Sequence, residues 1–160
     1  MELVIFVGLQ ASGKSSFYRA RFAGTHTLVS KDLMRNNRNP GRRQLQLIAE
    51  ALAAGRSVVV DNTNPTAADR LPLIELGRAH VARVVGYYFA SRLEDCLERN
   101  RARAGANRVP DVALYTTVKR LERPSAAEGF DALYHVRITG DGGFKVADWI
   151  EEPDDGQRLV

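Results

Sequence analysis

Short apolar runs alternate with segments of helical spacing along most of the chain. Branched and aromatic residues dominate five runs, which predict strands at residues 3–7, 25–30, 57–61, 82–90 and 131–138. Apolar positions between the runs recur at helical intervals and predict helices at residues 14–23, 42–54, 66–80, 91–103 and 110–121. Strands that alternate with helices favour a parallel sheet covered on both faces. The pattern therefore predicts an α/β fold of three layers with a central parallel sheet of about five strands.

The alternation continues without a repeat or a linker up to residue 150. We therefore expect a single domain over residues 1–150, which is long enough to bury a core. Residues 151–160 carry four acids and one base and are predicted to form an acidic, mobile tail. Ligands of such folds bind beyond the carboxyl ends of the strands, so we look for site residues after the first three strands.

Charge and cysteine content narrow the class of protein. The net charge is +4, and residues 1–150 alone carry +7, with 19 arginines but only 4 lysines in the whole chain. Arginine forks grip phosphates at two points, which suits an anionic substrate, although a genome rich in arginine codons explains the bias equally well. The single cysteine, Cys96, excludes an internal disulfide, and no apolar run approaches the roughly 18 residues of a membrane span. A cytoplasmic protein without membrane contact is the expectation.

The first strand runs directly into a glycine loop with the spacing G-x-x-x-x-G-K-S. Glycines let backbone N–H groups turn toward phosphate oxygens, and the following helix N-terminus adds positive potential. Lys14 is predicted to bridge the outer phosphates of ATP or GTP, and the Ser15 hydroxyl to ligate Mg²⁺. The predicted phosphate-binding residues are Gly8, Ala11, Ser12, Gly13, Lys14, Ser15 and Ser16.

Asp32 follows the second strand and is the only acid between Glu2 and Glu50. A kinase needs a carboxylate at this edge of the sheet to take the proton from an attacking hydroxyl, so we predict that Asp32 is the general base. A helix N-cap is the alternative role for this side chain. Arg35 lies one helical turn further on and is predicted to hold a phosphate of the acceptor, the alternative being a solvated surface arginine.

The third strand ends in Asp61, the position at which P-loop proteins keep a second magnesium-associated carboxylate. Asn62 and Asn64 follow at the tip of the strand and are candidates for binding substrate. Ordinary turn chemistry explains these two asparagines equally well.

Four arginines gather at the end of the helix that follows the fourth strand. Arg99 and Arg103 are four residues apart, so they are predicted to share one face of a helical lid over the transferring phosphate. An arginine in that position is worth roughly 10³–10⁵ in rate, and lid closure would also exclude water. A solvated basic face is the alternative.

Together these stretches resemble the polynucleotide 5′-hydroxyl kinases, the kinase module of end-healing enzymes. The resemblance rests on GLQASGKSSF, VSKDLMR, VVVDNTNP and the ERNRARAG…RVP block with PSAAEGFD (124–131) behind it. It implies a P-loop NTPase/kinase fold with a helical lid, ATP and Mg²⁺, and transfer of the γ-phosphate to a 5′-hydroxyl of DNA or RNA. It also implies Lys14 and Ser15 as nucleotide and metal residues, Asp32 as the base, and Arg99 and Arg103 as lid arginines. One departure is Lys31, where the family often has arginine.

The family enzymes commonly carry a phosphatase or ligase domain as well, for which this chain leaves no room. The resemblance therefore implies a stand-alone kinase or a subunit that works with a separate phosphatase or ligase partner. Two other functions stay open at this point. One is a P-loop kinase of a small metabolite, nucleoside or antibiotic, and the other is a nucleotide-binding switch or ATPase without an acceptor, for which Gln10 is the candidate residue to position water.

Overall fold

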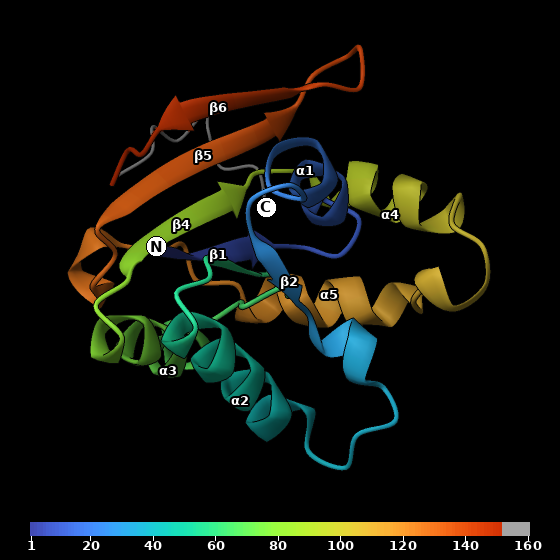
Figure 1. Cartoon of the computed structure of the whole chain (residues 1–160). Coiled ribbons are helices and arrows are strands. Elements are labelled where there is room, and N and C mark those ends of the chain that lie inside the picture. The colour runs from blue at the N-terminus through green and yellow to red at the C-terminus, as the bar shows by residue number, and fades with distance from the viewer. Residues whose placement is uncertain (152–160) are drawn as a thin grey trace.

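Six strands form one sheet in the computed structural model of the chain, which describes residues 1–151 (Figure 1). The strands are β1 (Glu2–Gly8), β2 (Thr27–Val29), β3 (Val58–Val60), β4 (Arg83–Phe89), β5 (Ala132–Ile138) and β6 (Phe144–Asp148). Their order across the sheet is β2-β3-β1-β4-β5-β6, and the first five strands are parallel. The prediction of a parallel sheet of five strands is confirmed.

The sixth strand was not expected from the sequence, and it pairs antiparallel with β5. Its sequence, FKVAD, is short and mixes polar with apolar residues, so it lacks the apolar run of a buried strand. A turn at Gly140–Gly143 brings it back, with Gly142 in the left-handed region at φ 82° and its N–H bonded to the Thr139 carbonyl. The turn and the pairing with β5 are therefore the reason that residues Phe144–Asp148 form a strand.

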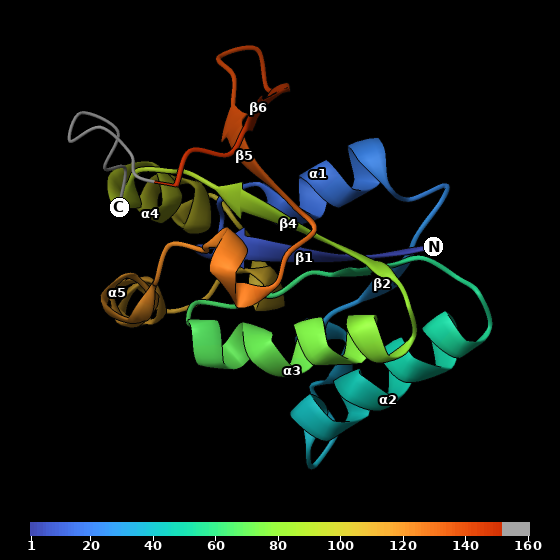
Figure 2. The ribbon, with the colours of Figure 1, turned by 90° about the vertical axis from the view of Figure 1, so that its left-hand side faces the viewer.

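Helices cover both faces of the sheet (Figure 2). The α-helices are α1 (Lys14–Arg21), α2 (Pro40–Ala53), α3 (Ala67–Ala79), α4 (Leu93–Arg101) and α5 (Asp111–Arg120). Three short 3₁₀ helices accompany them: η1 (Lys31–Met34), η2 (Gly105–Asn107) and η3 (Ala126–Glu128). Helices α2 and α3 lie on one face and α1 on the other, while α4 and α5 lie toward the end to which β4 points. The three-layer architecture is as predicted.

Alternation along β1 divides the core between the two faces of the sheet. Leu3, Ile5 and Val7 pack with α2 and α3, whereas Val4 and Phe6 pack with aromatic residues of α1, and all five side chains are fully buried. A third cluster joins α4 to α5 and contains Leu9, Cys96, Leu97 and Leu114. The loop between β1 and α1 therefore lies where all three clusters converge.

Glu151 is the last described residue, and its carboxylate accepts a hydrogen bond from the Ala126 N–H. The remainder of the predicted tail, residues 152–160, lies outside the described residues. Within residues 1–151, no helix is both long and apolar enough to cross a membrane.

Gly86 in the middle of β4 provides a test of this packing. A Cβ there would come within 2.5 Å of Leu133 Cδ2 and 2.8 Å of Phe130 Cε1, so Gly86→Ala should lower the free energy of unfolding by about 1–3 kcal/mol. Urea denaturation measures the change. Gly24→Ala is the matched control because nothing lies within 4 Å of the added atom, and a similar loss in both variants would contradict the packing described here.

Candidate active site

The loop between β1 and α1 has the backbone of a phosphate cradle. Gly13 and Ala11 adopt left-handed conformations, with φ of 97° and 61°, which turn successive N–H groups toward one side. A Cβ at Gly8 would lie 2.9 Å from Phe89 Cβ, so only glycine allows this close approach of the strands. The Ser12 hydroxyl is buried without a hydrogen-bond partner in residues 1–151. A bound phosphate oxygen would supply the partner that this buried hydroxyl lacks.

Lys14, the first residue of α1, folds back over the loop. Its Nζ donates hydrogen bonds to the carbonyl oxygens of Leu9 at 2.6 Å and Gly8 at 3.1 Å. Burial lowers the pKa of Lys14 from 10.5 to about 8. The charges of Asp61 and Asp32 act in the opposite direction, and that of Arg103 lowers this pKa further. Two carboxylates and one arginine of the predicted site therefore lie close enough to act on the Lys14 ammonium.

Ser15 and Asp61 meet across the edge of the sheet. The Ser15 hydroxyl donates to Asp61 Oδ2 at 2.7 Å, because β1 and β3 are parallel neighbours and both end at this edge. No group of three or more His, Cys, Asp or Glu side chains is arranged for a metal in the described part of the chain. Mg²⁺ is usually held by one or two carboxylates together with water and substrate phosphates, and this hydroxyl–carboxylate pair fits that donor set.

Asp32 lies on η1, just beyond the end of β2. The Ser30 hydroxyl accepts the Asp32 N–H at 3.2 Å and is the N-cap of this turn, so the alternative role of Asp32 as an N-cap is wrong. Its side chain is exposed to solvent. Arg35 ends the same turn, and its Nη2 donates to the Ala106 carbonyl of η2 at 3.1 Å. The η1 turn therefore contacts the segment that follows α4.

The two arginines predicted for the lid differ in their contacts. Helix α4 ends at Arg101, so the prediction that Arg99 and Arg103 share one helical face is wrong. Arg99 donates to the Ala11 carbonyl at 2.7 Å and to the Ser91 hydroxyl at 3.3 Å. Arg103 lies in the turn beyond the helix and donates to the Asn107 carbonyl at 3.3 Å, while its charge acts on Lys14. Arg99 therefore contacts the phosphate loop directly, whereas the hydrogen bond of Arg103 lies within its own turn.

Asn62 and Asn64, which follow β3, form hydrogen bonds within the protein, and so do two polar residues at the phosphate loop. Asn62 contacts the Lys31 N–H and Gln44, and Asn64 is buried with its amide donating to the Phe6 carbonyl at 2.8 Å. The Ser16 hydroxyl accepts from Arg19 at the surface of α1. The Gln10 amide nitrogen donates to Thr117 of α5 at 2.9 Å, which ties the loop to that helix.

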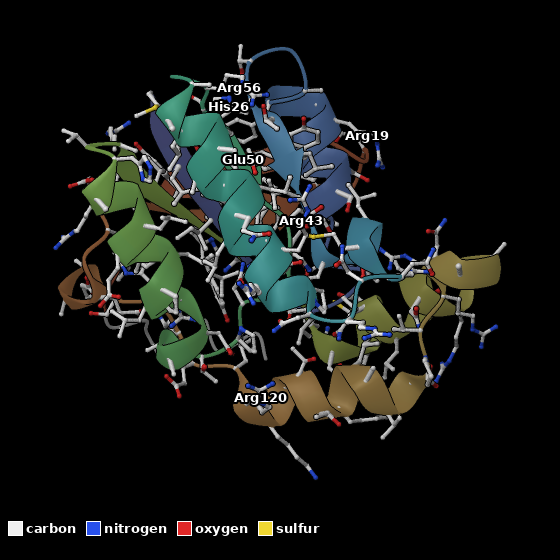
Figure 3. All side chains as sticks on the ribbon, turned by 60° about the horizontal axis from the view of Figure 1, so that its bottom comes forward. Arg19, His26, Arg43, Glu50, Arg56 and Arg120 are labelled. Carbon is white, nitrogen blue, oxygen red and sulfur yellow. The ribbon has the colours of Figure 1, made fainter. Side chains whose placement is uncertain are left out.

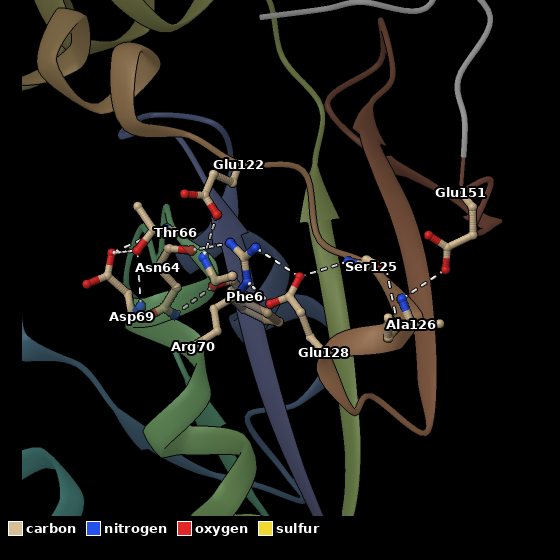
Figure 4. A network of polar contacts seen from close by, with 12 residues as sticks. Phe6, Asn64, Thr66, Asp69, Arg70, Glu122, Ser125, Ala126, Glu128 and Glu151 are labelled. Carbon is tan, nitrogen blue, oxygen red and sulfur yellow. Dashed lines mark hydrogen bonds and ion pairs between the residues drawn. The ribbon is translucent and has the colours of Figure 1, made fainter.

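An ion pair that sequence reasoning missed supports this end of the sheet (Figure 4). Arg70 of α3 has no exposed surface, and its guanidinium forms a two-point contact with Glu128 at 2.8 and 3.1 Å. The same guanidinium donates to the Asn64 carbonyl at 2.9 Å. Glu128 lies in the PSAAEGFD segment (124–131), which contributes to the family resemblance, but the sequence assigned it no role. Its partner lies 58 residues earlier in a helix, where no local pattern marks it.

A loop that can hold nucleotide phosphates, a hydroxyl–carboxylate pair for Mg²⁺, and an opposing carboxylate on a parallel sheet define the P-loop kinase fold. The sequence of residues 3–124 matches the family model described as AAA domain, and the chain belongs to this family.

Similar proteins agree with this class. The bifunctional polynucleotide phosphatase/kinase of Schizosaccharomyces pombe is 26% identical over 133 residues, which are 81% of this chain but 32% of that protein. The chain thus spans about a third of this relative's length. A gluconokinase from Sinorhizobium meliloti superposes with a TM-score of 0.59 at 23% identity, covering 85% of this chain and 82% of that one. The Mycobacterium tuberculosis APS kinase CysC, in complex with AMPPNP and APS, gives 0.58 at 21%, covering 84% and 87%. The two superpositions establish the fold.

Removal of one partner from the Arg70–Glu128 pair should be costly. Glu128→Ala would leave the buried Arg70 charge unpaired and should lower the free energy of unfolding by about 3–5 kcal/mol. Denaturant unfolding measures it. Glu94→Ala is the control because Glu94 pairs with Arg92 at the surface at 3.8 Å, where ion pairs contribute at most about 1 kcal/mol. Equal losses in the two variants would show that the buried pair has no special role.

The lowered pKa of Lys14 predicts proton uptake on nucleotide binding. Above pH 8 the unliganded Lys14 is mainly neutral, and nucleotide phosphates should restore its charge. ATP binding at pH 9 should therefore consume close to one proton per site. At pH 7 the unliganded Lys14 is already mainly charged, so it should contribute little proton uptake. Calorimetric titration in buffers of different ionisation enthalpy measures the uptake. Binding without proton uptake at pH 9 would mean that Lys14 is already charged in the unliganded protein.

Proposed function

We propose that this protein transfers the γ-phosphate of ATP to a 5′-hydroxyl of DNA or RNA. The observation that carries the proposal is a chain of contacts from the phosphate loop to the turn that carries Asp32. Ser15 donates to Asp61 at 2.7 Å, and Asn62, the next residue, accepts the Lys31 N–H at 2.9 Å. A carboxylate on a turn beside the phosphate loop is suited to serve a hydroxyl acceptor, and Asp32 is proposed for this role.

In the proposed reaction, Asp32 takes the proton from the attacking hydroxyl. A bond forms between the hydroxyl oxygen and the γ-phosphorus, the bond from that phosphorus to the bridging oxygen breaks, and ADP leaves. Lys14 and the loop N–H groups hold the phosphates, while Arg99 and Arg103 stabilise the charge on the phosphoryl group in flight. Mg²⁺, held by Ser15 and Asp61, would neutralise charge on the phosphate oxygens.

The charge around the acceptor side supports a polyanionic substrate. Exposed basic side chains occupy η1, the start of α2 and the segment after α4, namely Lys31, Arg35, Arg38, Arg42 and Arg108. Figure 3 looks onto α2 and labels a further arginine, Arg43, on its N-terminal half, with Glu50 closer to its end. Such a surface attracts a phosphodiester backbone, and Arg35 is proposed to contact the acceptor's phosphate.

A small-molecule acceptor is the second candidate function, and the position of the aromatic residues favours it. Tyr87, Tyr88 and Trp149 pack in the core or against other side chains, so none of them offers a face on which a base could stack. A kinase of a phosphorylated or otherwise polar metabolite would need no such platform. The acceptor therefore separates the two candidates, while the transfer chemistry is the same.

The nucleic-acid proposal extends to a partner enzyme and to a cellular location for this protein. The S. pombe relative is named as both a phosphatase and a kinase. We propose that the present chain supplies the kinase step and works with a separate phosphatase or ligase in the cytoplasm. Co-purification with such an enzyme would support this part.

Transfer of labelled phosphate from ATP to unphosphorylated DNA and RNA oligonucleotides tests the proposal. Label should appear at the 5′ end, and the affinity for the acceptor should fall steeply with salt. Asp32→Asn should reduce turnover by roughly 10²–10⁴-fold and leave ATP affinity nearly unchanged, because the side chain acts on the acceptor.

Three other outcomes are informative. Transfer to nucleosides or sugars but to no oligonucleotide would favour the small-molecule kinase. ATP hydrolysis that no hydroxyl compound alters would indicate an ATPase without an acceptor. Wild-type turnover by Asp32→Asn would show that Asp32 is not the base.

A further inference from the structure

The three residues after Asp61, here called the bridging loop (residues 62–64), lie between the two halves of the site. One half is the phosphate loop that follows β1, and the other is the η1 turn that carries Asp32. The sequence allowed these residues to bind substrate or to form a turn. Their contacts indicate a third role.

On one side, the bridging loop is fixed to β1. The Thr63 carbonyl accepts the Gly8 N–H at 3.1 Å, at the first residue of the phosphate loop. The Asn64 amide donates to the Phe6 carbonyl at 2.8 Å from a side chain that is only 5% exposed. The bridging loop therefore moves together with the strand that leads into the phosphate loop.

The buried Arg70–Glu128 ion pair also contacts the bridging loop, at Asn64. Asn64 has a left-handed φ of 43°, an uncommon conformation for a residue other than glycine. Its carbonyl accepts a hydrogen bond from Arg70, which Glu128 fixes in turn (Figure 4). The guanidinium therefore fixes the Asn64 carbonyl, and with it the end of the bridging loop.

On the other side, Asn62 reaches the η1 turn. Its Oδ1 accepts the Lys31 N–H at 2.9 Å, and its Nδ2 donates to Gln44 Oε1 at 2.5 Å. Gln44 belongs to α2 and is buried, so it provides a rigid partner. The orientation of the Asn62 amide follows from these contacts, because a backbone N–H can only meet its oxygen. Both ends of the amide are thus occupied by the protein.

We infer that Asn62 is a positioning residue, which sets the place of Asp32 relative to the phosphate loop. Asn62 accepts the N–H of Lys31, the residue before Asp32, and Gln44 holds the other end of the Asn62 amide; this arrangement is here called the clamp, and the bridging loop transmits the position of β1 to it. The consequence for catalysis rests on the proposed function, in which Asp32 must meet a hydroxyl beside the γ-phosphate. Loss of the clamp should lower turnover without weakening the binding of either substrate, because an error of about 1 Å in position can cost on the order of 10²-fold in rate.

Asn62→Ala, Gln44→Ala and the double variant test the clamp, with Gln46→Ala on the exposed side of α2 as the matched control. Hydrogen–deuterium exchange of residues 31–34 should become roughly 5-fold to 10-fold faster in the first two variants, as expected for the loss of one hydrogen bond. Exchange in β1 and β4 should not change. Unaltered exchange of residues 31–34 in Asn62→Ala would overturn the clamp.

Steady-state kinetics tests the consequence for positioning. In both single variants kcat should fall roughly 10-fold to 100-fold, with the KM values for ATP and acceptor within about 2-fold of wild type. The double variant should lose little more than either single one, because both side chains act through the same contact. A raised KM for the acceptor with unchanged kcat would mean that Asn62 binds substrate, and it would overturn the inference.

The two experiments separate failure of the clamp from failure of the proposed function. Exchange requires no acceptor, so it decides the clamp even if no oligonucleotide is phosphorylated. Faster exchange together with absent transfer in the wild type would reject the proposed function and keep the clamp.

Discussion

The parallel pairing of β1 with β3 determines the position of the other functional groups of this protein. Ile5 pairs with Val60, the last residue of β3, and β1 continues in the same direction to Gly8, so the phosphate loop and Asp61 lie toward the same edge of the sheet. The 2.7 Å contact between Ser15 and Asp61 is a direct result of this register. A shift of one residue would turn the side chains of β3 to the opposite faces and separate the two groups. The fully buried apolar residues of both strands make such a shift costly, so the core protects the geometry of the site.

Polar contacts, in addition to strand pairing and the apolar core, fix the position of the bridging loop. Hydrogen bonds to Phe6, Gly8 and Lys31 hold the bridging loop in place. The buried pair of Arg70 with Glu128 supports it from a segment more than sixty residues away in the sequence. A buried charge is costly to leave unpaired, so this arrangement favours one position of the loop over others. Specificity of this kind suits a site in which two substrates must meet within a fraction of an ångström.

Lys14 bonds to the phosphate loop, and charged side chains of neighbouring segments act on its pKa. Its ammonium lies in a buried environment with carbonyl oxygens as close partners, and burial lowers its pKa to about 8. Asp32 and Asp61 oppose the shift, and Arg103 adds to it. Direct hydrogen bonds join the neighbouring segments to the same region: Ser15 donates to Asp61 after β3, and Arg99 of α4 donates to the Ala11 carbonyl of the phosphate loop.

The sequence by itself determined the order of the first five strands and helices along the chain, the phosphate loop and the acidic residues at the strand ends. These features are local, because apolar periodicity and the G-x-x-x-x-G-K-S spacing reflect the secondary structure and backbone conformation of neighbouring residues. It also identified Glu128 as part of a motif, but not as the partner of Arg70. Only the tertiary structure decided that Asn62 and Asn64 face the protein, that α4 ends before Arg103, and that β6 adds to the sheet. The asparagine contacts join segments distant in the chain, and hydrogen bonds of that kind leave no periodic signal in the sequence. The end of α4 and the turn into β6 depend on nearer contacts, which the apolar pattern does not mark either.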